Sequence, residues 1–128
     1  MANIVLKKIS VCENVIVAFN GQLSLINLIS EITTKGLPAI YPKFAILTQS
    51  VGDVGSYEEV IEIVSLVDEK IVATTTGKAD IKGPGGNNFI ANFFNIAFPV
   101  EGRYWVKVTL AGNISTNKDD HIISVKKI

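Results

Sequence analysis

An alternation of apolar and polar residues runs without a break from Arg103 to Leu110, directly after a turn over residues 99–102. One side of this stretch carries Tyr104, Val106, Val108 and Leu110, and the other side carries Arg103, Trp105, Lys107 and Thr109. A period of two residues is typical of a β-strand with one buried and one solvated face. We therefore expect the first set of side chains to face a hydrophobic core.

Apolar stretches of strand length continue along the rest of the chain, and clusters of Gly, Pro, Asn and Asp separate them. The candidate strands cover residues 4–12, 15–19, 22–34, 43–51, 57–67, 71–79, 88–98, 114–116 and 121–127. Strands spaced by about 8–12 residues, with turn signals between them, are typical of a β-sandwich. No stretch of helical length shows a period of 3.6 residues. The sequence therefore predicts one all-β domain over residues 1–128, an antiparallel sandwich of about eight or nine strands.

The stretch around residues 18–34 is the least regular of these. Asn20-Gly21 between two apolar runs is a strong hairpin signal, because both residues tolerate the positive φ angles of a type I′ turn. In the strand that follows, the alternation breaks between Leu25 and Ile26 and again at Leu28 and Ile29. Two interpretations stay open, a β-bulge that resets the exposed face or a central strand buried on both sides. A helix over residues 24–31 fits the spacing, but the β-branched residues and the preceding turn argue against it.

Two segments are irregular by composition. Residues 35–42 contain Pro38 and Pro42, which remove backbone donors and extend the residues before them, so we predict a crossover between two sheets here. Residues 80–88 contain Gly83-Pro84-Gly85-Gly86 and are predicted to form an exposed loop. This segment lacks the Gly-Lys-Ser/Thr ending and the following helix of a phosphate-binding loop.

The charges balance at 12 basic and 12 acidic residues, and neither sign gathers into a long block. This distribution argues against nucleic acid or an anionic membrane as a partner, because both need a basic surface. Charged residues make up only 19% of the chain, below the usual value of about 25%. We therefore expect part of the surface to be covered by another copy of the chain or by a protein partner.

The amino-terminal stretch indicates a cytoplasmic protein. Lys7 and Lys8 lie in the middle of its apolar residues, where a secretory signal has a continuous hydrophobic region, so we expect no signal peptide. No run reaches the roughly 18 apolar residues that cross a bilayer. Cys12 is the one cysteine, and its apolar surroundings predict a buried, unreactive thiol, which fits a reducing compartment.

Signals for catalysis or metal binding are weak. The densest acidic group consists of Glu58, Glu59, Glu62, Asp68 and Glu69. No calcium-loop spacing surrounds it, and we interpret it as solvated charge at a sheet edge. His121 is the one histidine, which excludes multi-histidine metal sites, and no Gly-x-Ser-x-Gly motif marks a nucleophile. We therefore expect no enzymatic activity, no catalytic residue, no metal and no cofactor.

Trp105 is the strongest candidate for a binding residue. It falls on the solvated side of its strand between Arg103 and Lys107, and exposed tryptophan beside cationic side chains is used at protein interfaces and in sugar-stacking sites. Alternatively, a loop or a neighbouring strand of the same chain covers it. Trp105, Arg103 and Lys107 are the residues that we expect at an interface or a ligand site.

Gly102-Arg103-Tyr104 after a turn that contains proline resembles the tyrosine corner of immunoglobulin-like sandwiches, in which the tyrosine hydroxyl bonds to nearby backbone. Longer stretches resemble a family of short uncharacterised bacterial cytosolic proteins, a domain of unknown function. They are residues 12–16 (Cys-Glu-Asn-Val-Ile), 21–28 (Gly-Gln-Leu-Ser-Leu-Ile-Asn-Leu), 37–44 (Leu-Pro-Ala-Ile-Tyr-Pro-Lys-Phe), 102–104 and 110–112. The family pattern has proline before the glycine of its Gly-x-Tyr turn, and Glu101 stands there in this chain. The resemblance implies an immunoglobulin-like sandwich and assigns no catalytic residue.

Together these observations favour a non-enzymatic module that forms a homo-oligomer or binds a protein partner, through the face that carries Trp105 or through an edge strand. The alternative is a sandwich that binds a small molecule or a carbohydrate, with Trp105 and the glycine-rich loop at residues 83–86 as its site. A cluster of further polar groups around Trp105 in the fold would favour this alternative.

Overall fold

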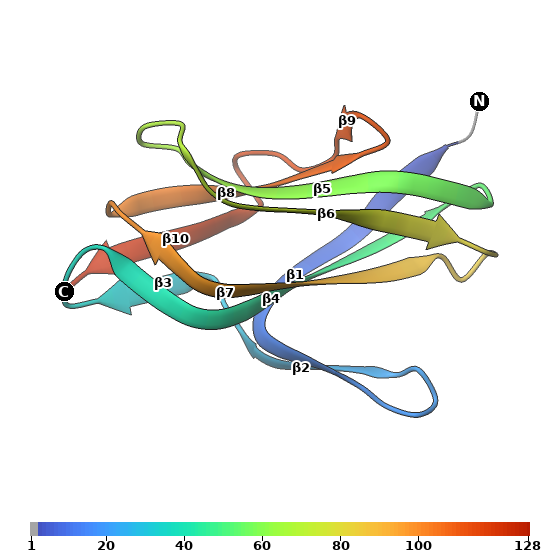
Figure 1. The fold of residues 1–128 in the computed structure, drawn as a ribbon, viewed down its shortest axis with the longest axis horizontal. Coiled ribbons are helices and arrows are strands. Elements are labelled where there is room, and N and C mark those ends of the chain that lie inside the picture. The colour runs from blue at the N-terminus through green and yellow to red at the C-terminus, as the bar shows by residue number, and fades with distance from the viewer. Residues whose placement is uncertain (1–2) are drawn as a thin grey trace.

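The computed structural model describes residues 3–128 and arranges them in ten β-strands, with no helix in that range. The strands are β1 (Ile4–Val17), β2 (Leu23–Leu28), β3 (Glu31–Thr34), β4 (Ala39–Gly52), β5 (Gly55–Ser65), β6 (Ile71–Ile81), β7 (Asn87–Phe98), β8 (Gly102–Leu110), β9 (Asn113–Ile114) and β10 (Ile122–Lys127). They form two facing sheets (Figure 1). The prediction of an all-β chain is confirmed.

The first sheet has the strand order β2-β1-β4-β7, and the second has the order β3-β10-β8-β5-β6 with the short β9 beside β8. Strands β3 and β10 run parallel, and the other pairs in the described chain run antiparallel. The prediction of a purely antiparallel arrangement is therefore wrong for this one pair. The chain changes sheets between β3 and β4, at residues 35–38. This confirms the crossover predicted for residues 35–42, but it is shorter than expected, because Pro42 lies inside β4.

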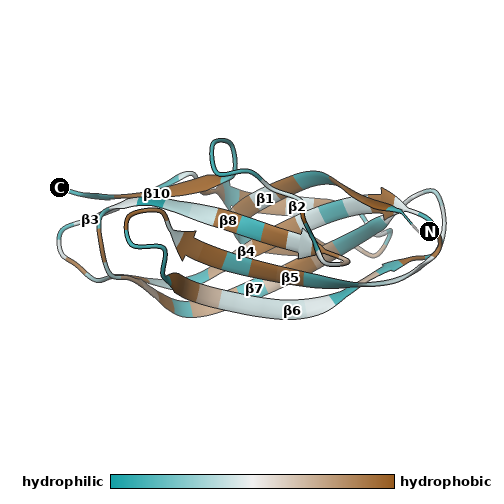
Figure 2. Cartoon of the chain, turned by 90° about the horizontal axis from the view of Figure 1, so that it is seen from above, coloured by the Kyte–Doolittle hydropathy of each residue, from teal (hydrophilic) through white to brown (hydrophobic). Residues whose placement is uncertain are grey.

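The core lies between the two sheets. Tyr104, Val106, Val108 and Leu110 of β8 are each at most 1% exposed, which confirms that this side of the strand faces inward. Phe44 of β4 and Phe93 of β7 stack in the opposite sheet, with ring centroids 5.1 Å apart. Apolar and polar residues alternate along β5 and β8, which gives these strands their banded colouring in Figure 2.

Tyr104 fixes the turn that precedes β8. Its hydroxyl donates a hydrogen bond to the carbonyl oxygen of Val100 (2.6 Å) and accepts one from the Val100 amide (3.2 Å). Its ring meets that of Phe98 edge to face, at a centroid distance of 5.0 Å. The hydrogen bond that a tyrosine corner predicts is therefore present.

The strand boundaries around residues 15–34 differ from the sequence prediction. Residues 15–17 continue β1 without a break, and residues 22–34 divide into β2 and β3, which belong to different sheets. The chain passes between the sheets at Ile29 and Ser30, which is where the second break in the alternation lies. The first break, between Leu25 and Ile26, lies within β2, which pairs with β1 in an unshifted register, so it is not a β-bulge. The interpretation of a central strand buried on both sides is wrong, because β2 is the edge of the first sheet. The short strands raise the count to ten from the expected eight or nine.

Candidate functional site

A hairpin projects from the body of the molecule, and we call residues 13–28 the arm. Strand β1 pairs with β4 only as far as Cys12, which lies opposite Ala45. Beyond this point β1 pairs with β2 alone, in register from Asn14 opposite Ile26 to Val17 opposite Leu23. Figure 1 shows the resulting two-stranded ribbon extending away from both sheets.

The turn at the tip of the arm explains why the chain reverses here. The Gly21 amide donates to the Ala18 carbonyl (2.9 Å), and the Ala18 amide donates to the Gln22 carbonyl (2.9 Å). Gly21 has a φ of +84°, a left-handed value that favours glycine. Asn20 has no positive φ, so the predicted hairpin is confirmed but its type I′ turn is wrong. The turn is centred on Phe19 and Asn20, and Gly21 takes the bulge position after it.

The arm is apolar and almost uncharged, with Glu13 as its one ionisable side chain. None of its residues belongs to the hydrophobic core or packs against it. Its largely exposed side chains are those of Ile16 (50%), Val17 (57%), Phe19 (115%), Ile26 (39%) and Leu28 (71%). The arm also holds the edge strand of the first sheet, which carries neither lysine nor proline to discourage pairing with another strand.

Hydrogen bonds fix the root of the arm to the body. The Glu13 carboxylate accepts one hydrogen bond from the Tyr41 hydroxyl (3.1 Å) and one from the side-chain amide of Asn27 (3.2 Å). The Lys43 ammonium donates to the side-chain oxygen of Asn14 (3.0 Å). The ribbon therefore leaves the sandwich from a defined base rather than from a free linker.

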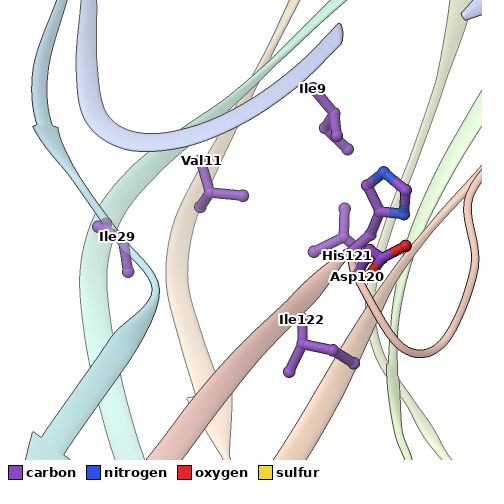
Figure 3. Close-up of a pocket in the computed structure, with 7 residues that line it drawn as sticks. Ile9, Val11, Ile29, Asp120, His121 and Ile122 are labelled. Atoms are coloured by element: carbon purple, nitrogen blue, oxygen red, sulfur yellow. The ribbon is translucent and has the colours of Figure 1, made fainter.

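A pocket of about 160 Å³ opens beside this root. Five of its seven lining residues are aliphatic and two are polar. They come from both sheets and from the segment that joins them, and they are Ile9, Val11, Ile29, Val106, Asp120, His121 and Ile122. Figure 3 shows these side chains around an opening, with the His121 ring pointing toward Ile9. The Ile29 amide donates to the Val11 carbonyl (2.8 Å), which ties two of the walls together.

The polar residues of the pocket are held by their own loop. Asn117 donates from its backbone amide to Nδ1 of His121 (3.1 Å) and from its side-chain amide to Asp120 (3.0 Å). Its side-chain oxygen accepts hydrogen bonds from the backbone amides of Asp119 (3.0 Å) and Asp120 (2.8 Å). His121 thus lies in a loop at the start of the last strand, as the sequence predicts.

Trp105 lies on the outer face of the second sheet, as its parity predicts, but its side chain is only 8% exposed. The ammonium groups of Lys107 and Lys118 lie 5.6 Å and 5.4 Å from the centre of its ring. Lys118 comes from the loop before β10, so the chain itself covers Trp105. Of the two alternatives for Trp105, an exposed binding residue or a residue covered by its own chain, the structure shows the second. Arg103, the third candidate, is exposed two residues earlier on the same face.

The structure does not bring Trp105 and the glycine-rich loop together. Trp105 pairs with Val64 at one end of β5, and the loop follows Ile81, which pairs with Gly55 at the other end. These ends are about 30 Å apart at roughly 3.3 Å per residue. The two features therefore do not form one ligand site.

The acidic group is divided by the fold, and its interpretation as charge at a sheet edge is wrong. Strand β5 lies between β8 and β6, and Glu59 points inward with 0% exposure. The Thr48 hydroxyl donates to one oxygen of Glu59, and the other oxygen has no partner in the described chain. Burial raises the pKa of the Glu59 carboxyl, and the Thr48 hydrogen bond lowers it by less. Glu62, on the opposite face, lies 3.8 Å from the Lys107 ammonium.

The remaining predictions concern Cys12, metal binding and membrane-spanning segments. Cys12 is buried, and desolvation raises the pKa of its thiol, as expected for an unreactive cysteine. Within residues 3–128, no three His, Cys, Asp or Glu side chains cluster in a way that could hold a metal ion. No helix in the same range has the length and apolar character needed to cross a membrane.

The sequence reasoning missed the arm. Its signal is the run from Asn14 to Ser30 without any charged residue, which includes both strands and the Asn-Gly turn. No curated protein matches the chain. Residues 7–119, which include the whole arm, match the model of a family of unknown function, DUF6941, and the chain belongs to this family.

Proposed function

We propose that this chain is a non-enzymatic interaction module that assembles with other protein chains through its arm. The observation that carries the proposal is the apolar ribbon of residues 13–28, which projects from the sandwich and contributes nothing to its core. This proposal takes the edge strand, not the face that carries Trp105, as the principal contact surface.

In water, such a ribbon leaves its apolar side chains exposed to solvent. An isolated two-stranded hairpin is at best marginally stable, and its apolar side chains gain about 1.5–3 kcal/mol each when fully buried. Ile16, Phe19 and Leu28 are at least half exposed in the single chain. A second protein surface that covers them supplies this free energy, and the unpaired edge of β2 offers backbone groups for strand addition.

The proposal includes an immunoglobulin-like fold and a cytoplasmic location. The hydrogen bonds of Tyr104 to Val100 support the first, because this corner is a hallmark of that sandwich. The buried free thiol of Cys12 supports the second, because thiols persist in reducing compartments.

The test is the solution mass of wild type and of a triple arm variant, Ile16→Thr, Ile26→Thr and Leu28→Thr. Threonine is β-branched, which strands favour, and it removes apolar surface. We expect light scattering to show a defined oligomer for wild type and a monomer for the variant at the same concentration. Circular dichroism should show the same strand content for both.

A matched control variant replaces exposed apolar residues outside the arm, with Val54→Thr, Val67→Thr and Ile71→Thr. These side chains are 73%, 62% and 55% exposed, so the change in surface is similar. The control should keep the mass of wild type. A monomeric wild type at about 100 μM, far above the Kd of specific complexes, would contradict self-association. A control variant that also becomes monomeric would show that assembly does not depend on the arm in particular.

A further inference from the structure

We propose that the arm tip of one copy docks in the pocket of a second copy, with Phe19 filling the space between Ile9, Val11 and Ile29. This inference rests on the proposed function and names both the occupant of the pocket and the target of the arm. Two copies that exchange arms about a twofold axis form a closed dimer, because each supplies one tip and one pocket.

The pocket and the tip match in size, and five of the seven residues that line the pocket are aliphatic. An apolar cavity of about 150 Å³ accommodates a benzene ring, and the pocket measures about 160 Å³. Phe19 is 115% exposed, so its whole phenyl ring is available for burial. It is the only phenylalanine among the exposed side chains of the arm.

Two polar groups of the pocket already have hydrogen-bond partners within their own loop. Asp120 and Nδ1 of His121 already accept hydrogen bonds from Asn117. Ile9, Val11 and Ile29 pack against the core and offer their remaining surface to an apolar side chain. An uncharged segment with an aromatic tip fits these walls, and residues 14–30 provide one without a single charged residue.

The arm cannot reach the pocket of its own chain. Val11 and Ile29 line the pocket and also form the root of the arm, where a backbone hydrogen bond of 2.8 Å joins them. From this root the paired strands extend as one ribbon, and Phe19 lies about 25 Å from Val11 at roughly 3.3 Å per residue. Folding back would break the ladder between β1 and β2. The tip can therefore fill this pocket only on another copy.

The test is disulfide cross-linking between two separately purified variants, Asn20→Cys and Ile29→Cys, mixed in equal amounts with oxidised glutathione as the oxidant. Asn20 is exposed next to Phe19 at the tip, so this variant keeps the phenyl ring. We expect a cross-linked heterodimer to form at least tenfold faster than in a mixture of Asn20→Cys with Thr76→Cys. Thr76 is exposed on the outer face of the second sheet and reports random collision. The native Cys12 does not interfere, because it is fully buried.

A mixture of Asn20→Cys with Phe94→Cys tests the competing target. Phe94 is 61% exposed on β7, the other edge strand of the first sheet. Faster cross-linking at this position than at Ile29→Cys would overturn the proposal, because the tip would then dock on the sheet edge. Equal rates at Ile29→Cys and Thr76→Cys would overturn it as well.

A second measurement separates this inference from the proposed function. Phe19→Asp should weaken self-association at least tenfold, whereas Phe19→Leu should keep most of it, and neither change affects folding because the side chain has no contacts in the single chain. If the triple arm variant dissociates but Phe19→Asp does not, the arm mediates assembly and the pocket is not its target. If none of these variants changes the mass, both proposals fail.

Discussion

Two hairpins of this chain, the arm and the hairpin of β5 and β6, are both rich in aliphatic residues but have opposite environments. The second hairpin contributes Ile61, Ile63, Ala73, Ala79 and Ile81 to the core, each at most 9% exposed. The arm contributes no residue to the core, although it carries isoleucine, leucine and valine at a similar density.

The difference arises from what lies beside each ribbon. Strand β5 has β8 on one side and β6 on the other, and the opposite sheet covers its inner face. In the arm, β1 has only β2 beside it beyond Cys12, and no second sheet faces either strand. An apolar strand pattern therefore does not by itself show that a strand is buried, because the topology decides whether a second sheet covers it.

The largest expected effect comes from equivalent truncations in the two hairpins. Ile63→Ala removes a fully buried side chain and should lower the free energy of unfolding by about 2–5 kcal/mol. Ile26→Ala in the arm should lower it by less than about 1 kcal/mol at concentrations where the chain is monomeric. Urea unfolding followed by circular dichroism measures both. Equal losses for the two variants would show that the arm packs on the body in solution.

The body of the fold could be predicted from the sequence because its signals are local. The alternation from Arg103 to Leu110 identifies the inward face of β8. The proline-containing stretch 35–42 indicates a crossover. Tyr104, in its Gly-x-Tyr turn, predicts the hydrogen bond from its hydroxyl to nearby backbone. Each of these depends on a few neighbouring residues and on backbone chemistry that holds in any fold.

The arm could not be predicted in the same way. Residues 83–100 also lack charge, yet β7 within them places Phe93 and Phe98 in the core. A lack of charge alone therefore does not separate a buried strand from an exposed one. The burial of Glu59 escaped prediction for a related reason, since its neighbours in sequence are charged and the strand that covers it is not adjacent in sequence.

Glu59 offers a second way to sharpen the contrast, because it is a carboxyl group inside the buried hairpin. Burial raises the pKa of this group, so the folded chain holds the proton more tightly than the unfolded chain. The free energy of unfolding should therefore fall as the pH rises from the unperturbed value of 4.5 to the raised one, and stay level above it.

Glu59→Gln keeps an acceptor for the Thr48 hydroxyl and removes the charge. It should raise the free energy of unfolding at pH 8 by about 1–3 kcal/mol, and the gain should vanish near pH 4. Thermal unfolding across this pH range measures the effect. Glu58→Gln, at an exposed position on the same strand, controls for the loss of one negative charge. A gain that is the same at both pH values would mean that the Glu59 carboxyl is not responsible.

The smallest expected effect contrasts Trp105, which its own chain covers, with Phe19, which nothing in the chain covers. Lys118→Ala removes one of the two ammonium groups over the indole ring and should cost about 0.5–1 kcal/mol. Because Trp105 is the only tryptophan, its fluorescence reports this site directly. We expect the emission to shift to longer wavelength and acrylamide to quench it more strongly. An unchanged spectrum would show that Lys118 does not shield the ring.

The change of sheet at Ile29 and Ser30 has a mechanical consequence. One strand of the arm continues through β1 into the ladder with β4, and the other continues through β3 into the parallel ladder with β10. A force applied to the arm therefore acts on two ladders at the same time, one in each sheet. An assembly joined through such arms would transmit tension into both sheets and distribute the load across the whole sandwich.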